Sequence, residues 1–350
     1  KNMRELKIND LKINDESECF VIAEVGHNHQ GSVDTAMKIF DAAKESGANA
    51  VKLQKRDNKN LFTKEMFDSQ YSSDNAYGDT YGKHRDALEF GMDEYIELKQ
   101  YAEELGLVFF ATPFDLPSVD FLEKLDAPMY KIASGDLKST PLLEYIAKTG
   151  KPILISTGGG DIIDVDRAHE VISSINPNLA ILQCTAAYPC DPADMNLNVI
   201  STFRDKYPDK VIGLSDHQSG ISMAMVAFTL GARIVEKHFT LNRAWKGTDH
   251  AFSLEPVGLR KLVRDLKRAK VALGDGQKKS IEKEEKPLYK MGKKLVAAHD
   301  LKKGTVVTSK DLTIKSPNDG LPPYEINTIL GKVLNRDLSK DENISLDDFK

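Results

Sequence analysis

Short apolar runs alternate with longer amphipathic stretches over most of the chain. Eight runs rich in β-branched and aromatic residues recur at intervals too long for hairpins. They are FVIAEV (20–25), NAVKLQ (49–54), LVFFAT (107–112), MYKIAS (129–134), PILIST (152–157), AILQCT (180–185), VIGLS (211–215) and RIVEKHF (233–239). The segments between them have apolar residues at helical spacing, and several end on Gly, where a left-handed C-cap is expected. The pattern therefore predicts repeated strand–helix units.

Eight such units ending near residue 272 predict an α/β fold, a (β/α)8 TIM barrel of about 250 residues. An open, doubly wound sheet is the competing architecture. The alternation is interrupted at residues 55–91, a polar and aromatic stretch too long for a plain connection, which is typical of a lid, a binding loop or a disordered insertion. Because it follows the second strand, we expect it to lie over the catalytic face of a barrel.

A second, smaller domain is predicted at the C-terminal end. The charged run KKSIEKEEKP (278–287) indicates a solvated linker, and the residues after it contain short β-like pieces and many turn residues. We therefore expect a catalytic domain over 1–275, a linker over 276–290 and a small domain over 291–350.

The composition narrows the class of protein. The chain has 350 residues, with 48 Lys and Arg against 53 Asp and Glu, and the basic residues are scattered, so nucleic acid is not an expected partner. No apolar run is long enough to span a membrane and the first residues do not resemble a signal peptide, so we expect a soluble cytoplasmic protein. Cys19, Cys184 and Cys190 have unrelated spacings, which predicts reduced thiols.

Polar and charged side chains stand at the carboxyl ends of the predicted strands, where barrel enzymes carry their chemistry. They are Glu24, Lys52, Gln54, Lys131, Ser134, Ser156, Thr185, Tyr188, Ser215, His217, Glu236 and His238. One such residue is easily structural, but convergence from this many strands indicates an active site.

Lys52 and Lys131 interrupt strands that are otherwise apolar, which is costly unless each ammonium group meets an anion. Together with the nearby serines and the Gly158–Gly160 turn, they predict a pocket for a phosphate or another oxyanion. The alternative is that each lysine pairs with a barrel carboxylate, such as Glu236 or Asp216. Glu24 could likewise move a proton, orient a hydroxyl or pair with a barrel lysine.

His217 and His238 end neighbouring predicted strands, so their imidazoles should meet at one rim. Two neutral imidazoles with open positions suit a divalent ion such as Mn, Fe, Co or Zn. A hydrogen-bonded pair or a general acid is the alternative. The spacing leaves the roles of three further histidines open, His27, His29 and His250, and three others are predicted to lie on the surface, His84, His169 and His299.

These strand-end motifs also resemble a known family. AEVGHNHQGS, AVKLQ, ATPFD, YKIASGD, ISTGG, QCTAAYP, GLSDH, EKHFT and DHAFSLEP are similar, in order and spacing, to the sialic acid synthase family, which makes N-acetylneuraminate and related nonulosonates. The similarity covers residues from about 18 to 272, and the last segment resembles the antifreeze-like SAF domain of that family. Nine ordered motifs form a specific match.

The resemblance implies a metal-dependent transferase reaction. Phosphoenolpyruvate would condense with the open-chain aldehyde of N-acetylmannosamine or a related sugar, with C–O cleavage and release of phosphate. His217 and His238 match the family's metal ligands, for Mn²⁺ first and Mg²⁺ or Co²⁺ as alternatives. Glu24 matches a catalytic acidic residue, and Tyr188 and Asp249 match acceptor-side residues. The residues that match contacts to phosphoenolpyruvate are Lys52, Gln54, Lys131, Ser134, Ser156, Ser215 and Glu236, and Thr185 is counted with the substrate-binding group.

Two departures put the acceptor in doubt. Ala186 replaces an Asn that is common in the family, and Ser316 replaces an Arg expected to reach the acceptor's N-acetyl group from a partner subunit. The resemblance also implies a domain-swapped homodimer. Two other functions remain open, a condensing enzyme or aldolase for a non-acetylated sugar, and a non-catalytic protein associated with coat polysaccharide.

Overall fold

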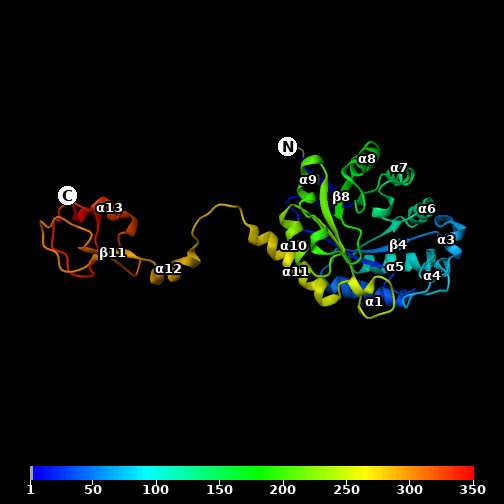
Figure 1. The fold of residues 1–350 in the computed structure, drawn as a ribbon, viewed down its shortest axis with the longest axis horizontal. Helices are drawn as coiled ribbons and strands as arrows, with labels where there is room; N and C mark the ends of the chain where they lie inside the picture. The colour runs from blue at the N-terminus through cyan, green and yellow to red at the C-terminus, as the bar shows by residue number, and fades with distance from the viewer. Residues whose placement is uncertain (1–2) are drawn as a thin grey trace. The chain divides into compact units, whose positions relative to one another are not determined.

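Eight parallel strands close into a barrel in the larger of two compact units. The computed structural model describes residues 3–350, and the two units divide between Gly274 and Asp275. The strands follow the order β10-β3-β4-β5-β6-β7-β8-β9 around the closed sheet, and helices surround them (Figure 1). The predicted (β/α)8 barrel is therefore confirmed, and the open sheet is wrong.

All eight predicted runs become strands. The barrel strands are β3 (Phe20–Gly26), β4 (Ala50–Lys55), β5 (Val108–Pro113), β6 (Tyr130–Ile132), β7 (Ile153–Ser156), β8 (Leu179–Cys184), β9 (Val211–Asp216) and β10 (Ile234–His238). The helices that follow them are α1 (Val33–Ser46), α5 (Met92–Glu104), α6 (Leu116–Lys124), α7 (Thr140–Ala147), α8 (Ile162–Ser173), α9 (Val199–Lys206), α10 (Ser222–Thr229) and α11 (Pro256–Leu273).

Helix α1 illustrates how local sequence sets these boundaries. The Ser32 side chain accepts a hydrogen bond from the Thr35 amide at the first turn, and Gly47 ends the helix in the left-handed conformation at φ 93°. Ala36, Ile39, Phe40 and Ala43 recur at helical spacing and are buried against the barrel. The predicted glycine C-cap is confirmed here.

Side chains along each strand alternate between the outside and the inside of the barrel. Val21 and Ala23 of β3 pack outward in the large core beneath the helices, whereas Phe20 and Ile22 point inward to a second apolar cluster. By the same alternation, Glu24 occupies the next inward position of β3. The interior is therefore apolar at the amino ends of the strands and polar at their carboxyl ends.

A hairpin that the sequence analysis did not predict covers the amino ends of the strands. It comprises β1 (Glu5–Ile8) and β2 (Leu11–Asn14), which pair in antiparallel orientation. Leu6, Ile8 and Ile13 are buried with the inward-facing residues of the barrel. This end of the interior is closed, which leaves the carboxyl end for a ligand.

Residues 55–91 are ordered and hold three short helices, α2 (Asn58–Leu61), α3 (Lys64–Asp68) and α4 (Tyr81–Ala87). His84 of α4 was predicted to lie on the surface, and this is wrong because it is only 2% exposed. Its ring packs against Tyr71 at a centroid distance of 4.6 Å, and its Nδ1 accepts a hydrogen bond from the Tyr77 amide. Aromatic packing thus gives this segment a small core of its own.

The smaller unit, from Asp275 onward, has a separate apolar cluster. Helix α12 (Glu285–Met291) precedes an antiparallel pair of strands, β11 (Lys294–Ala297) and β12 (Leu312–Lys315), and a short helix α13 (Ile326–Ile329) follows. Leu295, Ile329 and Phe349 are among the buried residues that hold it together. Most of this unit is irregular and β structure, as the sequence indicates.

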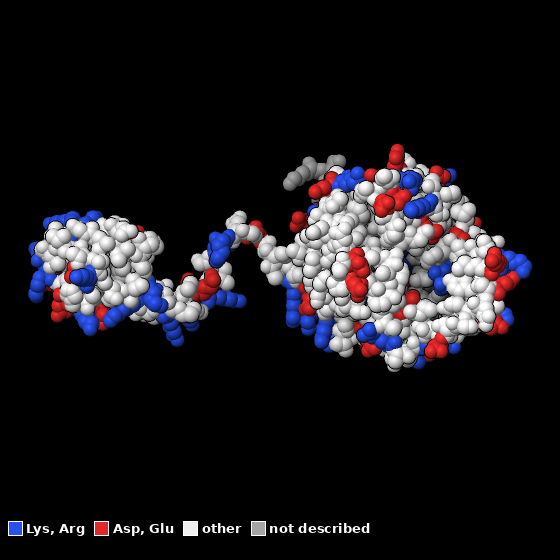
Figure 2. All heavy atoms as spheres, in the orientation of Figure 1, with Lys and Arg blue, Asp and Glu red and all other residues white. Residues whose placement is uncertain are grey.

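Acidic and basic side chains are interspersed on the visible face of the barrel unit (Figure 2). Among residues 3–350, no helix is both long enough and apolar enough to cross a membrane.

Candidate active site

A cavity of about 300 Å³ lies at the carboxyl ends of the barrel strands. The alternation of side chains accounts for its lining, because each strand contributes the polar residue that follows its inward apolar positions. The predicted residues that line it are Glu24, Lys52, Gln54, Lys131, Ser134, Ser156, Tyr188, Ser215, His217, Glu236, His238 and Asp249.

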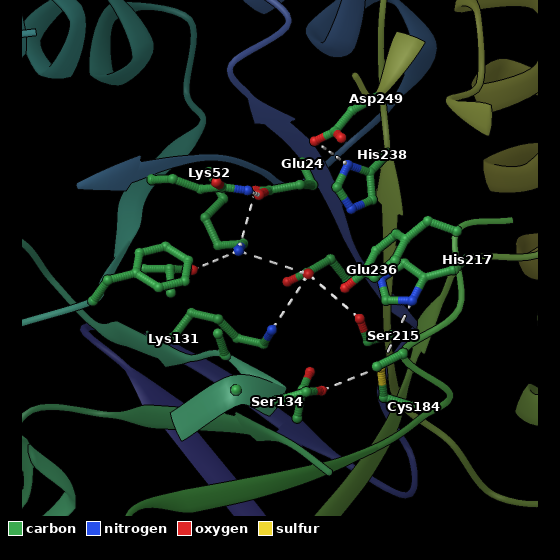
Figure 3. A pocket seen from close by; sticks show the side chains of 18 of the residues that line it. Glu24, Lys52, Lys131, Ser134, Cys184, Ser215, His217, Glu236, His238 and Asp249 are labelled. Carbon is green, nitrogen blue, oxygen red and sulfur yellow. Dashed lines mark hydrogen bonds and ion pairs between the residues drawn. The ribbon is translucent and has the colours of Figure 1, made fainter. Parts of the chain in front are cut away.

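Two lysines and two carboxylates form a buried cluster in this cavity (Figure 3). The Lys52 Nζ lies 3.2 Å from Glu24 Oε2 and 3.7 Å from Glu236 Oε1, and the Lys131 Nζ lies 3.4 Å from the same Glu236 oxygen. Each of the four side chains is less than 5% exposed. We call Glu24, Lys52, Lys131 and Glu236 the lysine–carboxylate cluster. Both lysines pair with carboxylates, as the alternative prediction held.

The two carboxyls of the cluster differ in acid strength. Burial raises the pKa of Glu24 to about 7, and the negative charge of Glu236 adds to this shift against the opposing effect of Lys52. Burial acts on Glu236 in the same direction, but the ammonium groups of Lys131 and Lys52 outweigh it and lower the pKa to about 2. With Glu24 protonated, the cluster holds two ammonium groups and one carboxylate. The cluster then has one net positive charge, which can attract an anion even though the lysines pair with carboxylates.

Serine hydroxyls surround the cluster. The Ser156 Oγ is buried and has no hydrogen-bond partner in the described structure, and the Ser215 Oγ lies 3.5 Å from Glu236 Oε1. The Ser134 Oγ accepts a hydrogen bond of 2.9 Å from the Gly158 amide. An unpartnered buried hydroxyl next to two ammonium groups suits an oxyanion.

The predicted contribution of the Gly158–Gly160 turn to this pocket is wrong. The Gly158 amide already donates to Ser134, while Gly159 and Gly160 line a neighbouring hollow beside α8. Thr185 also faces that hollow, where its hydroxyl donates to the Asp194 carbonyl, and its side chain does not line the cavity. Thr185 contributes a backbone contact instead, through its carbonyl.

His217 and His238 lie at one rim, with ring centroids 5.5 Å apart. The His217 Nδ1 is 2.9 Å from the Thr185 carbonyl, which only accepts, so this nitrogen carries a proton. Burial disfavours the charged ring, but Cys184 and the Thr185 carbonyl outweigh it and raise the pKa of His217, so a cation at Nε2 competes with a proton. The His238 Nδ1 lies 3.7 Å from Asp249 Oδ2 and has no hydrogen bond. Burial lowers the pKa of His238 to about 4, so its ring is neutral near pH 7.

This donor set fits a divalent cation that keeps open positions. Two imidazoles with a carboxylate nearby resemble sites for borderline transition metals. No group of three or more His, Cys, Asp or Glu side chains within residues 3–350 is arranged to hold a metal by itself. Further ligands would have to come from water or substrate.

Three histidines with undecided roles do not line the cavity. His29 stacks on Phe90, His27 lies 3.5 Å from Glu89, and the His250 Nδ1 is 2.7 Å from the Thr240 hydroxyl. Their contacts support the loops around the site.

Several lining residues were missed, namely Arg56, Arg85, Thr112, Phe114, Cys184 and Thr248. The position of Thr112 was predictable, because Thr112 ends the third predicted strand. Its Oγ1 accepts a hydrogen bond of 2.6 Å from Lys52 Nζ. Cys184 occupies the inward position of β8 and was predictable by the same alternation. Arg56 was also predictable, because it follows Lys52 and Gln54 at the same two-residue spacing. Arg85 belongs to the irregular part of the 55–91 segment, where no periodic pattern of residues predicts its direction.

Comparisons with known proteins agree on the family to which the chain is similar. Residues 39–278 match the model of the NeuB family, and residues 294–350 match the SAF domain. The chain is 40% identical over 327 residues to the N-acetylneuraminate-9-phosphate synthase of Homo sapiens, covering 93% of this chain and 91% of the human protein. It is 35% identical to the N,N'-diacetyllegionaminic acid synthase of Campylobacter jejuni, covering 93% and 98%.

A solved structure from the same group of enzymes is also similar to this chain. The crystal structure of N-acetylneuraminic acid (sialic acid) synthetase from Leptospira borgpetersenii, in complex with citrate, aligns with a TM-score of 0.71 at 31% identity. The alignment covers 82% of this chain and 96% of that chain.

Proposed function

The chain belongs to the NeuB family, with a C-terminal SAF domain, and on this premise we propose that it is a nonulosonate synthase. It condenses phosphoenolpyruvate with the open-chain aldehyde of N-acetylmannosamine or a related amino sugar and releases phosphate. The observation that carries the proposal is the lysine–carboxylate cluster, which lies beside a pair of imidazoles in one buried cavity.

The lysine end of the cavity binds phosphoenolpyruvate. Lys52 and Lys131 supply two positive charges, and Ser134, Ser156 and Ser215 supply hydroxyls for its carboxylate and phosphate oxygens. An anion at this position also raises the pKa of Glu24 further, so substrate binding favours the protonated carboxyl.

The reaction forms one carbon–carbon bond and breaks one carbon–oxygen bond. C3 of phosphoenolpyruvate attacks the aldehyde carbon, and positive charge develops at C2. Water adds at C2 and phosphate departs with the bridging oxygen. Glu24, with a pKa of about 7, can hold or release a proton near neutral pH, and Gln54, which donates to Glu24 Oε1 at 2.7 Å, orients it.

His217 and His238 would hold a divalent metal ion, Mn²⁺ in our proposal, with Mg²⁺ and Co²⁺ as alternatives. Such an ion supplies Lewis-acid polarisation of the aldehyde oxygen when it is bound. Asp249, next to His238, and Tyr188, whose ring lies 4.1 Å from that of His217, face the acceptor side of the cavity.

The relatives differ in the product for which they are named. The human relative is named for a 9-phosphate, whereas the C. jejuni relative is named for diacetyllegionaminic acid. Three carbons added at C1 of a hexosamine turn its C6 into C9 of the product. A 9-phosphate product thus corresponds to an acceptor phosphorylated at C6.

A lysine-dependent aldolase is the second candidate, and one observation favours it. Burial lowers the pKa of Lys131, which increases the fraction of the unprotonated amine that a Schiff base requires. Such an enzyme needs no metal and is trapped by borohydride. The synthase loses activity to a chelator and gives no reduced adduct, so the two treatments separate the candidates. A non-catalytic role fits less well, because the cavity keeps a complete set of reactive groups.

The proposal is tested by phosphate release from phosphoenolpyruvate with Mn²⁺. The acceptors are N-acetylmannosamine, its 6-phosphate, mannose and a diacetamido-hexose, each with a chelator control. Release with an acetamido sugar, abolished by the chelator, is the expected result. No release with any acceptor would contradict the proposal.

The family likeness also supports a homodimeric enzyme of the cytoplasm. Light scattering on the full chain should give twice the mass of 38.9 kDa. A monomer at working concentration would contradict the dimer.

A further inference from the structure

Two guanidinium groups line the part of the cavity that adjoins the 55–91 segment. Arg56 directly follows β4, and Arg85 lies on α4. We call Arg56 and Arg85 the guanidinium pair. None of the roles assigned above uses either residue.

Arg56 is held rigidly in a buried position. Its guanidinium stacks on the Phe114 ring at 3.8 Å, and its Nη1 donates to the Gln54 Oε1 at 2.9 Å. Only 8% of the residue is exposed. Burial lowers the pKa of Arg56 to about 10, which still leaves the group charged at neutral pH. Arg56 therefore presents a fixed positive charge beside Gln54.

Arg85 also contacts neutral groups. Its Nε donates to the Tyr81 hydroxyl at 3.0 Å, and its Nη1 lies 3.3 Å from the His27 Nδ1. Burial lowers the pKa of His27 well below its usual value, so that ring is neutral and can accept the hydrogen bond. These contacts position the guanidinium without compensating its charge.

Within residues 3–350, no carboxylate oxygen lies close enough to either guanidinium to form an ion pair. Glu89 accepts a hydrogen bond of 3.4 Å from the Arg56 backbone amide, and its side chain pairs with Lys55 at 3.2 Å. Lys52 and Lys131 differ in this respect, because both contact Glu236. Asp249 and Glu89 are near enough to act on Arg56 through their charge, and Asp249 also interacts with Arg85, but neither forms a direct ion pair with a guanidinium. Two partly desolvated guanidinium groups without a direct ion pair favour an anionic ligand.

The guanidinium pair is separated from the lysine–carboxylate cluster. Lys52, Gln54 and Arg56 are alternate residues, and four residues at about 3.3 Å each put the backbones of Lys52 and Arg56 up to roughly 13 Å apart. A chain of contacts links them, from Arg56 through Gln54 and Glu24 to Lys52. The cavity thus has two cationic ends with Gln54 and Glu24 between them.

We infer that Arg56 and Arg85 form a second anion subsite, which binds a phosphate group at the end of the acceptor sugar remote from its aldehyde. The inference rests on the proposed function, since it assigns the lysine end to phosphoenolpyruvate and the middle of the cavity to the sugar. A guanidinium can contact two phosphate oxygens at once, which suits a terminal dianion. The acceptor class is then an amino-sugar 6-phosphate.

The test compares two acceptors with the full chain at saturating phosphoenolpyruvate and Mn²⁺. In the unchanged protein, kcat/KM should be higher for N-acetylmannosamine 6-phosphate than for N-acetylmannosamine. Arg85→Gln should lower kcat/KM for the phosphorylated sugar about tenfold or more. It should change kcat/KM for the free sugar, and KM for phosphoenolpyruvate, by less than about threefold. Arg56→Gln, which also loses its stacking on Phe114, should act in the same direction.

Lys83→Gln is the matched control. Lys83 lies on the same helix and pairs with Asp79 at 2.9 Å, and it is 64% exposed. Its replacement removes one positive charge without touching the cavity and should leave both acceptors unaffected. A loss as large as that of Arg85→Gln would mean that the overall charge matters, which would overturn the subsite.

Calorimetry without phosphoenolpyruvate gives a readout independent of turnover. The full chain should bind N-acetylmannosamine 6-phosphate, and Arg85→Gln should weaken this binding about tenfold or more. Equal losses for both sugars, or a raised KM for phosphoenolpyruvate alone, would overturn the inference. If the free sugar reacts as well as its phosphate, the subsite is wrong while the synthase proposal stands. If neither sugar releases phosphate, the proposed function fails, and the subsite falls with it.

Discussion

Glu24 and Glu236 contact the same ammonium group, that of Lys52, yet their surroundings give them opposite acid strengths. Glu236 also contacts Lys131, and the two positive charges keep it ionised. Glu24 meets one ammonium and one neutral amide, so burial dominates and raises its pKa to about 7. The cavity thereby holds a carboxylate for charge balance and a carboxyl that can exchange a proton.

Replacement of Glu24 by Gln tests this division. Gln keeps the shape and accepts the hydrogen bond from Gln54, but it cannot exchange a proton. We expect Glu24→Gln to lower kcat about 100-fold or more. Mn²⁺ affinity should change less than about threefold, because His217 and His238 are intact. Turnover should be measured by phosphate release and metal affinity by calorimetry, and unchanged turnover would remove Glu24 from the proton transfer.

His84 predicts a pH dependence in the 55–91 segment. Burial lowers the pKa of His84 to about 4, with the charges of Arg85 and Lys246 acting in the same direction. An opened segment would have the ordinary value of about 6.5 and bind the proton more readily. The packed segment is therefore fully stabilised above about pH 6.5 and loses stability as the pH falls towards 4.

Hydrogen exchange over residues 55–91 checks this prediction. After correction for the intrinsic rate, exchange should be faster at pH 5 than at pH 7. His84→Gln, which retains an acceptor for the Tyr77 amide, should remove most of the difference. Equal protection of the unchanged protein at both values would contradict the account.

Single residues were predictable where strand alternation fixes their direction. Glu24, Lys52, Lys131, Ser215 and Glu236 stand at inward strand positions, and the cavity contains all of them. Thr185 lies one residue beyond β8 and turns to the neighbouring hollow. Arg56 continues the alternation of Lys52 and Gln54 one residue beyond β4, whereas Arg85 depends on how an irregular segment packs, which no short-range pattern encodes.

At the level of elements, the eight barrel strands were predictable because both faces of each are buried and their runs are apolar. The β1–β2 hairpin was not, since its strands, ELKI and LKIN, mix charged with apolar residues and form no continuous apolar run. Its apolar residues enter the barrel interior, so it contributes to stability at the end opposite the cavity.

Truncation of Ile8 tests the role of the hairpin. Ile8 is 1% exposed and packs inside the barrel, so Ile8→Ala should destabilise the barrel unit by about 2–5 kcal/mol. Leu11→Ala is the control in the same hairpin, because Leu11 is 42% exposed and should cost about 0.5 kcal/mol or less. Denaturant unfolding gives both values. Activity at denaturant concentrations below the unfolding transition should be unchanged. A similar loss of unfolding free energy in both variants would argue against a stabilising role of the hairpin.

At the level of the whole molecule, the chain combines a barrel with a small unit that has its own apolar cluster. The division was visible in the sequence as a change from periodic segments to a charged run. Ser316 lies in the smaller unit, where its hydroxyl donates to the Gly292 carbonyl. We attribute acceptor choice to the guanidinium pair, which lines the barrel cavity.

The most direct test of the synthase account follows the bridging oxygen of phosphoenolpyruvate. The full chain is given Mn²⁺, an acetamido sugar or its 6-phosphate, and phosphoenolpyruvate labelled with ¹⁸O between carbon and phosphorus. The account predicts acceptor-dependent release of phosphate that carries the label, because the C–O bond breaks. Unlabelled phosphate, or phosphate release that does not depend on the sugar, would contradict it.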